Sequence, residues 1–463
     1  MENLNLNFID VFLVASYLII CLVIGISKFD KVKTLRDYTL GVKPFSTSVL
    51  IATTFATAIS AHKTIGSVGK AYSMGLVFIV SMFLIPIGWF IMASLLAKNL
   101  SFFHKEKFLT MGDIMEYWYG KMGRWLTSVC AVAFTLGMTA AGSMAIGGLL
   151  HYFFGVDENF GMLAALAIVT IYSSFGGIQA VAFTDVFQFL IFFIALPIAC
   201  AIGYNNVGGY QNIINALPAS HLTIDIENIS LFIGMMVFAL MPNADIPFIQ
   251  RAILAHNSHQ LKSTFNSVAL LMYPLFIMIA LIGLIMYGYD PNINTNIVLY
   301  HFINDYLPAG VVGLMIAGIL AIVMSTQDSF LNTTSTLVAR DVCKQIWPKI
   351  TDSQELLIAR ISCVSISLFS VVLLFLKKDI LELIWFITNF WDPLVIVPFI
   401  ACLIGVKINK RHFFILPVLV LTAEFIAAQV VGSFDTRSFT VGIIVSMTTL
   451  FVLHKSHSYK NVI

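Results

Sequence analysis

Charged residues are scarce in this chain of 463 residues, and their scarcity excludes most soluble architectures. Only 11% of the residues are Asp, Glu, Lys or Arg, against about 25% in a typical soluble domain, while 59% are apolar. So few charges cannot cover the surface that a soluble chain of this length exposes to water. The composition therefore predicts a membrane protein.

Other absences narrow the functional class. The six cysteines show no spacing typical of a disulfide framework or a zinc site. No loop between apolar runs exceeds about 30 residues, which leaves no room for a soluble catalytic domain. We find no nucleophile-and-base pair and no phosphate-binding loop, so we do not expect an enzyme. The net charge of +2 gives no indication of nucleic-acid binding.

Long apolar runs are abundant instead. Runs of about 17 to 25 residues can each cross a hydrocarbon core of about 30 Å. The first run lacks the basic segment and small-residue cleavage site of a signal peptide, so we expect it to be kept as a helix. The sequence thus predicts an all-α membrane protein, one domain with 13 transmembrane helices, at residues 8–27, 45–68, 75–97, 126–150, 160–175, 183–204, 229–245, 265–287, 310–337, 357–376, 381–403, 413–431 and 439–453.

Basic residues predict the orientation of the chain, because cytoplasmic loops collect Lys and Arg. With the N-terminus outside and the C-terminus inside, 21 of the 26 basic residues fall in inside loops or the tail, and Arg251 is one of them. Lys63 lies within a span, and the remaining four, in outside loops, are Lys70, Lys377, Lys378 and Arg437. A miscounted span would reverse every later loop, so the steady alternation supports thirteen crossings.

Two spans contain residues that interrupt a membrane helix. The second mixes small, hydroxyl and charged residues from Ala56 to Gly69, and the seventh sets Pro242 and Pro247 around an amide and a carboxylate. Each proline removes a backbone donor and clashes with the preceding turn, so the seventh span should break. Broken helix in lipid is tolerated only where it faces protein or a water-filled cavity.

Spans two and seven are five apart, which is the spacing of two five-helix halves related by an inverted repeat. We predict a 5+5 inverted repeat with a first half at 45–204 and a second at 229–403. An extra N-terminal helix at 8–27 and two extra C-terminal helices at 413–453 complete the chain. Transporters place substrate and ion sites where such broken helices meet.

A polar cluster, Ser325 to Ser329, follows an apolar run in the ninth span. A charge at the bilayer centre costs about 2.5 to 3.5 kcal/mol on insertion scales, so Asp328 among hydroxyls indicates an ion or proton site. Ser325 and Ser329 are four residues apart, and Ile322 and Ser325 are three apart, so these positions share one helix face. Hydroxyls and carbonyls freed by a helix break are the oxygen ligands that sodium uses in discontinuous-helix transporters.

Four motifs resemble those of the sodium:solute symporter family. The most specific runs from Gly176 through Asp185 to Gln188 and is similar to the family's G-G-I-x-A-V-x-x-T-D-x-x-Q signature. The others are Asp37-Tyr38-Thr39-Leu40-Gly41, Gln250-Arg251-Ala252-Ile253-Leu254-Ala255 and Ile322-Val323-Met324-Ser325-Thr326-Gln327-Asp328-Ser329. Together they extend from about residue 37 to 340 in the family's order.

The resemblance implies an inverted-repeat fold of the leucine-transporter type and sodium-driven uptake of a small solute. It implies one sodium held by the carbonyls of Ala56, Ile59 and Ile322 and the hydroxyls of Ser325 and Thr326. Some family members hold a second sodium, and its positions are matched here by Asp185, Ser325, Asp328 and Ser329. Asp185 is also suited to a gate or to a helix N-terminus.

The solute site is predicted at the break in the second span. Its candidate residues are Ser60, Ala61, His62, Lys63 and Thr64, with Phe83, Phe238, Asn243, Trp385, Asn389 and Trp391 as walls. If Lys63 points inward, it favours a solute carboxylate by charge pairing, which indicates an amino acid, a monocarboxylate or another organic anion. The family's sugar carriers tend to have Gln at the matching position. Asn243 and Asp245 are equally suited to a structural role beside the prolines, and both tryptophans to anchoring at the membrane interface.

Other functions stay open at this point. His62 could carry protons in place of sodium. The chain could also be a transporter-like sensor acting through a separate partner, or a sodium-independent channel, although sites that occlude ions would slow permeation. The short loops favour a multi-pass protein of a bacterial inner membrane, whose partners are sodium, a small solute and the bilayer.

Overall fold

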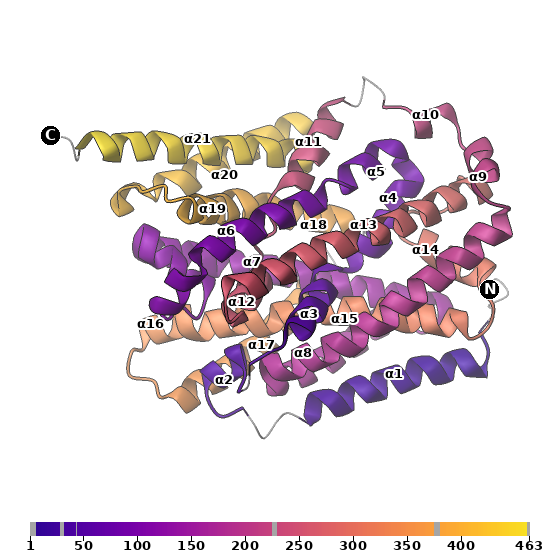
Figure 1. Ribbon diagram of the computed structural model, residues 1–463, viewed down its shortest axis with the longest axis horizontal. Coiled ribbons are helices and arrows are strands. Elements are labelled where there is room, and N and C mark those ends of the chain that lie inside the picture. The colour runs from indigo at the N-terminus through magenta and orange to yellow at the C-terminus, as the bar shows by residue number, and fades with distance from the viewer. Residues whose placement is uncertain (1–5, 28–31, 43, 225–228, 375–379, 461–463) are drawn as a thin grey trace.

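Helices are the only regular secondary structure in the part of the chain that the computed structural model describes, which is residues 6–27, 32–42, 44–224, 229–374 and 380–460. No strand occurs in these residues, so the predicted all-α class is confirmed. The long helices run along one direction of an elongated bundle, with α1 at one edge and α20 and α21 at the opposite edge (Figure 1). Five residues of the orientation argument lie outside the described residues: Lys28, Lys31, Lys43, Lys377 and Lys378.

The first part of the chain forms α1 (Phe8–Ile26), α2 (Leu35–Leu40), α3 (Thr47–Ala58), the π-helical turn η2 (His62–Gly66), α4 (Ser67–Met74), α5 (Leu76–Met82), α6 (Ile85–Lys105), α7 (Met111–Phe154) and α8 (Glu158–Val207). The middle forms α9 (Tyr210–Ala216), α10 (Ala219–Leu222), α11 (Ile229–Leu240), α12 (Ile246–Leu254), α13 (Ser258–Tyr289), α14 (Val298–Tyr306) and α15 (Val311–Leu337). The last part forms η4 (Val338–Cys343), α16 (Lys344–Ile346), α17 (Asp352–Leu374), α18 (Ile380–Trp391), η5 (Asp392–Ile396), α19 (Val397–Leu403), η6 (Lys410–His412), α20 (Ile415–Val431) and α21 (Thr436–Lys460).

Ten helices in the described residues are long and apolar enough to cross a membrane, rather than the thirteen of the sequence count. The predicted second and seventh spans are missing from the ten because their apolar helices, α3 and α11, are short and end at breaks. The predicted fifth and sixth spans fall within the single 50-residue helix α8. The count of thirteen, the membrane orientation and the inverted repeat stay predictions.

Helix α8 reverses direction at Gly177, where φ is 60° and ψ is −173°. The start of α8 packs on α7, because a Cβ placed on Gly147 would lie 2.3 Å from Met162. The end of α8 packs on α14, because a Cβ on Gly203 would lie 2.4 Å from the Phe302 ring. Helices α7 and α14 also touch each other, so the two ends of α8 lie near one another and its halves run side by side. Glycine is required at the reversal, since other residues are strained at positive φ.

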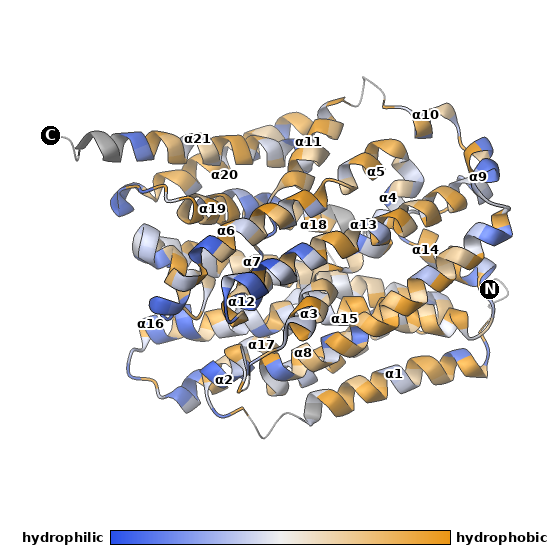
Figure 2. Ribbon diagram, in the orientation of Figure 1, coloured by the Kyte–Doolittle hydropathy of each residue, from blue (hydrophilic) through white to orange (hydrophobic). Residues whose placement is uncertain are grey.

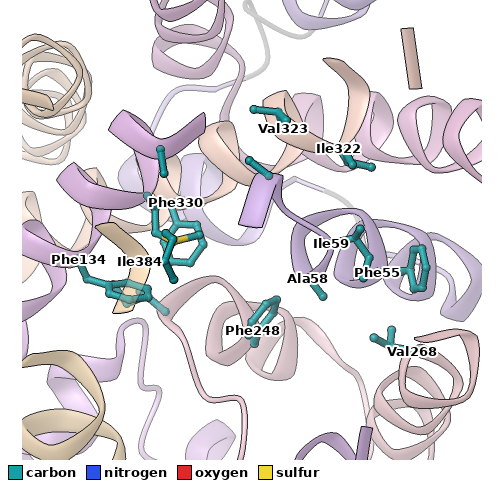
Figure 3. Packing of buried hydrophobic residues seen from close by; sticks show 14 of the residues in the cluster. Phe55, Ala58, Ile59, Phe134, Phe248, Val268, Ile322, Val323, Phe330 and Ile384 are labelled. Carbon is teal, nitrogen blue, oxygen red and sulfur yellow. The ribbon is translucent and has the colours of Figure 1, made fainter. Parts of the chain in front are cut away.

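Helix α15 lies at the centre of the bundle. It packs against α1, α3, α7, α8, α12 and α17, and almost all of its residues are buried. Hydrophobic residues cover the long helices, while hydrophilic ones gather at the loops and, unusually, on α12 within the bundle (Figure 2). Apolar residues pack around part of α15: Ile322, Ile59, Phe134 and Ile384 all belong to one buried cluster (Figure 3).

The two predicted helix interruptions are present. Helix α3 begins at its cap Ser46, whose hydroxyl accepts from the backbone N–H of Val49, and it ends before Ile59, which has extended geometry. Helix α11 ends at Leu240 and the chain resumes as α12 at Ile246, with a proline in the first turn of the new helix. A proline is tolerated there because the N–H that it lacks would have no helical partner.

Candidate transport site

Carbonyl oxygens from two helices converge on one hydroxyl at the end of α3. The hydroxyl of Thr326, on α15, lies 3.3 Å from the carbonyl oxygens of both Thr57 and Ile59 and 3.0 Å from that of Ile322. A hydroxyl has one proton, so it satisfies only one of these three acceptors at a time. The carbonyl lone pairs that receive no hydrogen bond from this hydroxyl can serve as ligands for a small hard cation.

One side chain of the predicted sodium site is directed elsewhere. Ala56 is buried in the last turn of α3, but the hydroxyl of Ser325 donates to the Asp185 carboxylate and not toward the carbonyls around Thr326. The described residues hold no group of three or more His, Cys, Asp or Glu side chains suited to a metal ion, so the cluster offers carbonyls and hydroxyls only.

Arg251 occupies the centre of the predicted second sodium site. Its Nη2 donates to the hydroxyls of Ser329 (2.6 Å), Thr53 and Thr57 (both 3.2 Å), and it lies 3.5 Å from the Asp185 carboxylate. The side chains of Arg251 and Asp185 are both 0% exposed. The sequence analysis assigned this arginine to an inside loop, and that assignment is wrong because it lies in α12 and points into the bundle. Its position directly after Gln250, beside a broken span, was the available signal.

Asp328 is directed away from this group. One of its oxygens accepts from the Tyr172 hydroxyl at 2.9 Å, and the other has no hydrogen-bond partner among the described residues. The predicted second-sodium set is therefore divided: Asp185, Ser325 and Ser329 gather around Arg251, whereas Asp328 faces α8.

Neighbouring positions of α15 each contact a different helix. Ser325 bonds to Asp185 on α8, and Thr326 bonds to the end of α3. Gln327 donates to the Thr139 carbonyl on α7 at 2.8 Å, and Ser329 accepts from α12. This turn of α15 thus contacts four helices, α3, α7, α8 and α12.

A small cavity of about 70 Å³ opens beside the break. Four predicted solute-site residues line it: His62, Lys63, Phe238 and Asn243. Asp245, for which solute contact and a structural role were equally expected, lines it too. Its other side chains were not predicted as walls, and these include Ile85, Phe134, Met138, Ile384, Thr388 and Asp392. A second, smaller cavity beside it is lined by Ser60, Ala61 and His62 together with Thr326. The space for a solute therefore adjoins the Thr326 hydroxyl and the carbonyls around it, which we call the oxygen cluster.

The charged groups of the larger cavity are held by few bonds. Lys63 Nζ donates to the Asn243 side chain at 3.5 Å, and the Asp245 carboxylate accepts from the Trp391 indole at 2.9 Å. The Trp391 ring stacks on Phe134, with the ring centroids 5.2 Å apart. Trp391 is therefore buried and supports the cavity wall.

Four predicted solute-site residues lie away from the cavity. The Thr64 hydroxyl donates to the Ser60 carbonyl, and Phe83 stacks on Tyr273. Trp385 lies beneath the Lys70 ammonium, 5.2 Å from its ring centroid, and Asn389 accepts a bond from Ser438 at 2.8 Å. Asn389 thus ties α18 to α21 and is not free for a solute.

Polar contacts link α2, α12 and α15. Gln250 donates to the Thr39 carbonyl at 2.8 Å, and the Thr39 and Thr336 hydroxyls lie 3.1 Å apart. A separate cavity of about 610 Å³ is lined by charged residues of three predicted inside loops, both basic (Arg36, Lys107, Arg340 and Lys344) and acidic (Asp352 and Glu355). These loops therefore lie on the same face of the molecule.

Comparison with known proteins gives consistent results. The family described as "Sodium:solute symporter family" matches residues 38–414. The osmoregulated proline transporter of Bacillus subtilis is 26% identical over 380 residues, which are 77% of this chain and 76% of that protein. The sodium/glucose cotransporter of Vibrio parahaemolyticus is 23% identical over 394 residues, 74% of this chain and 71% of that protein. Among solved structures, an outward-open, substrate-bound sodium-coupled sialic acid symporter superposes with a TM-score of 0.79 at 21% identity, covering 97% of this chain and 98% of its own.

Proposed function

Because this chain belongs to the sodium:solute symporter family, we propose that it imports a small organic solute bearing a carboxylate, driven by sodium, across a bacterial inner membrane. One observation carries the proposal: the carbonyls freed at the end of α3 meet the Thr326 hydroxyl directly beside the cavity that holds Lys63. An ion bound beside the Thr326 hydroxyl would fix the adjoining wall of the cavity that holds Lys63. Binding of the ion and binding of the solute would therefore be coupled.

Sodium would bind among the carbonyls of Ile59 and Ile322 and the hydroxyl of Thr326. The Thr57 carbonyl, which the sequence analysis did not include, reaches the same hydroxyl and adds an oxygen. Ala56 and Ser325 complete the predicted set, and Ser325 would have to turn from Asp185 to reach the ion.

The carboxylate of the solute would bind Lys63, whose single bond to Asn243 leaves two N–H donors free. A cationic group beside a buried cavity favours an anionic partner because the local dielectric is low. Proline and sialic acid, which the names of two similar proteins include, are acids, whereas glucose, named for a third, is neutral. The residues of the cavity therefore support a carboxylate-bearing solute more directly than the solutes named for the similar proteins do.

Arg251 and Asp185 would act as an internal gate. A guanidinium and a second sodium cannot share one set of oxygens, and Arg251 fills the centre of that set. A second sodium could enter only after Arg251 had left, which would also release α12 from α3 and α15. Opening of the gate and release toward the cavity of about 610 Å³ would then be one movement.

The test begins with a thermal-shift screen of small carboxylates, amino acids and sugars in sodium against potassium, because a bound ligand raises stability by mass action. Uptake of a hit into proteoliposomes is then measured with an imposed sodium gradient. We expect uptake to rise with the gradient, and Thr326→Ala to raise the sodium concentration for half-maximal uptake by roughly tenfold or more. The control is Thr264→Val, which removes a buried hydroxyl of the same kind from α13, where it bonds to the Gln260 carbonyl.

Other outcomes would point elsewhere. A flux that does not depend on sodium would favour a channel, and ligand binding without any flux would favour a sensor. An unchanged sodium requirement in a folded Thr326→Ala protein would remove the oxygen cluster as the sodium site.

A further inference from the structure

The solute cavity holds two carboxylates as well as one ammonium group. Asp245 and Asp392 line the same cavity as Lys63. Asp245 comes from the break between α11 and α12, and Asp392 begins the π-helical turn η5, so the two acids reach the cavity from different elements. With both carboxylates ionised and His62 neutral, the cavity carries two negative charges and one positive charge.

The two carboxylates differ in their partners. Asp245 accepts a hydrogen bond from the Trp391 indole, which fixes its position. The Asp392 carboxylate forms no hydrogen bond or ion pair with any described residue, and Lys63 has no ion pair with either acid. A charged group withdrawn from water without a partner is costly. Asp392 is therefore the group of this cavity that most needs a cation from outside the protein.

The walls of the cavity suit a positively charged nitrogen. Phe134 and Phe238 both line it, and aromatic faces attract ammonium groups and alkylated nitrogens. Lys63, with donors to spare, is available to the opposite end of a solute. Sodium in the adjoining oxygen cluster would add one positive charge and balance the excess negative charge of the cavity.

We propose that the transported solute is a zwitterion, with its carboxylate bound by Lys63 and its cationic nitrogen bound by Asp392. This inference rests on the proposed function and narrows it: a monocarboxylate without a nitrogen would leave Asp392 unpaired and add a second uncompensated negative charge. An amino acid or a betaine satisfies both ends of the cavity, and its net charge of zero keeps the loaded site balanced once sodium is bound.

The experiment compares solutes that differ only in the nitrogen. Purified protein is screened by thermal shift in sodium and in potassium against the proteinogenic amino acids, glycine betaine and glucose. Each zwitterion is paired with its nitrogen-free acid: L-proline with cyclopentanecarboxylate, L-alanine with isobutyrate, and glycine betaine with 3,3-dimethylbutyrate. We expect a zwitterion to bind in sodium with an affinity on the order of 100-fold above its nitrogen-free partner. In Asp392→Asn that difference should fall to about tenfold or less.

The matched control is Asp245→Asn, which removes the carboxylate that Trp391 already holds and should preserve more of the discrimination. The wild-type comparison alone tests the proposal should a variant fail to fold. Equal binding of the paired acids, binding of glucose or nitrogen-free acids without any zwitterion, or full discrimination in a folded Asp392→Asn protein would each overturn it. Sodium-dependent binding of nitrogen-free acids would leave the proposed function standing, whereas a zwitterion that binds equally in potassium would contradict the sodium coupling and leave this inference intact.

Discussion

Replacing Arg251 by Gln should convert the group around Arg251 and Asp185, the proposed gate, into a sodium site. The substitution removes the guanidinium and leaves the Asp185 carboxylate beside the hydroxyls of Thr53, Ser325 and Ser329, which is a donor set for a small cation. Removing one partner of a buried ion pair costs about 3 to 5 kcal/mol because the other charge is left buried alone. In potassium, Arg251→Gln should therefore be markedly less stable than wild type.

Sodium should restore part of that loss. If sodium binds the vacated position with a Kd of about 10 mM, then about 100 mM sodium adds about 1.4 kcal/mol of stability by mass action. The assay is thermal unfolding of purified protein in sodium and in potassium at equal ionic strength, which keeps the screening of surface charges the same. The gain from sodium should exceed that of wild type in Arg251→Gln and disappear when Asp185→Asn is added, because the double variant lacks the carboxylate that the hydroxyls of Thr53 and Ser325 contact.

Arg124→Gln is the matched control. Arg124 is also a buried guanidinium paired with carboxylates, at 2.5 Å from Asp341 and 2.8 Å from Asp113, but it lies away from the oxygen cluster. It should destabilise the protein with the same sodium gain as wild type. An equal loss for Arg251→Gln in both salts, or a sodium gain that survives Asp185→Asn, would refute the idea that arginine and sodium compete for one position.

Three further outcomes are expected. Trp391→Phe leaves Asp245 without its donor and should reduce both stability, by about 1.5 to 3 kcal/mol, and solute affinity, measured by thermal shift with and without the solute. Gly177→Ala should destabilise by more than Gly405→Ala, because both have positive φ but only at Gly177 would the new Cβ meet backbone, 3.1 Å away; equal melting temperatures would contradict this. Glu424→Met should raise the melting temperature, since both carboxyl oxygens of the fully buried Glu424 lack a hydrogen-bond partner among the described residues, and a lower melting temperature would contradict this.

The helix breaks were predictable from the sequence because their causes are local. Pro242 and Pro247 interrupt a helix wherever they occur, and the polar residues from Ala56 to Gly69 mark a span that lipid alone would not accept. The motif predicted Thr326 beside Ile59 and Ile322, and the structure brings these groups within hydrogen-bond distance, while their binding of sodium stays a prediction.

The remaining parts of the site depend on tertiary placement. Arg251 follows an apolar helix, as basic residues of inside loops do, and only its position after Gln250, beside a broken span, indicates that α12 carries it back into the bundle. Asp392 precedes Pro393, a pattern that usually ends a helix, yet here the chain continues as a π-helical turn and presents the acid to the cavity. Asn389 and Trp385 are residue types that often line binding sites, but here Asn389 contacts α21 and Trp385 contacts Lys70.

The four partners of α15 restrict how this protein can diverge. Neighbouring residues on an α-helix are turned by about 100° from one another. Inserting or deleting a single residue before Ser325 would therefore present every partner with the wrong side chain at once: Asp185, the end of α3, Thr139 and Arg251. Point substitutions can alter these contacts one at a time, but a change of length within α15 cannot. Homologous chains should thus vary in the length of their loops and terminal helices while the number of residues across this turn stays fixed.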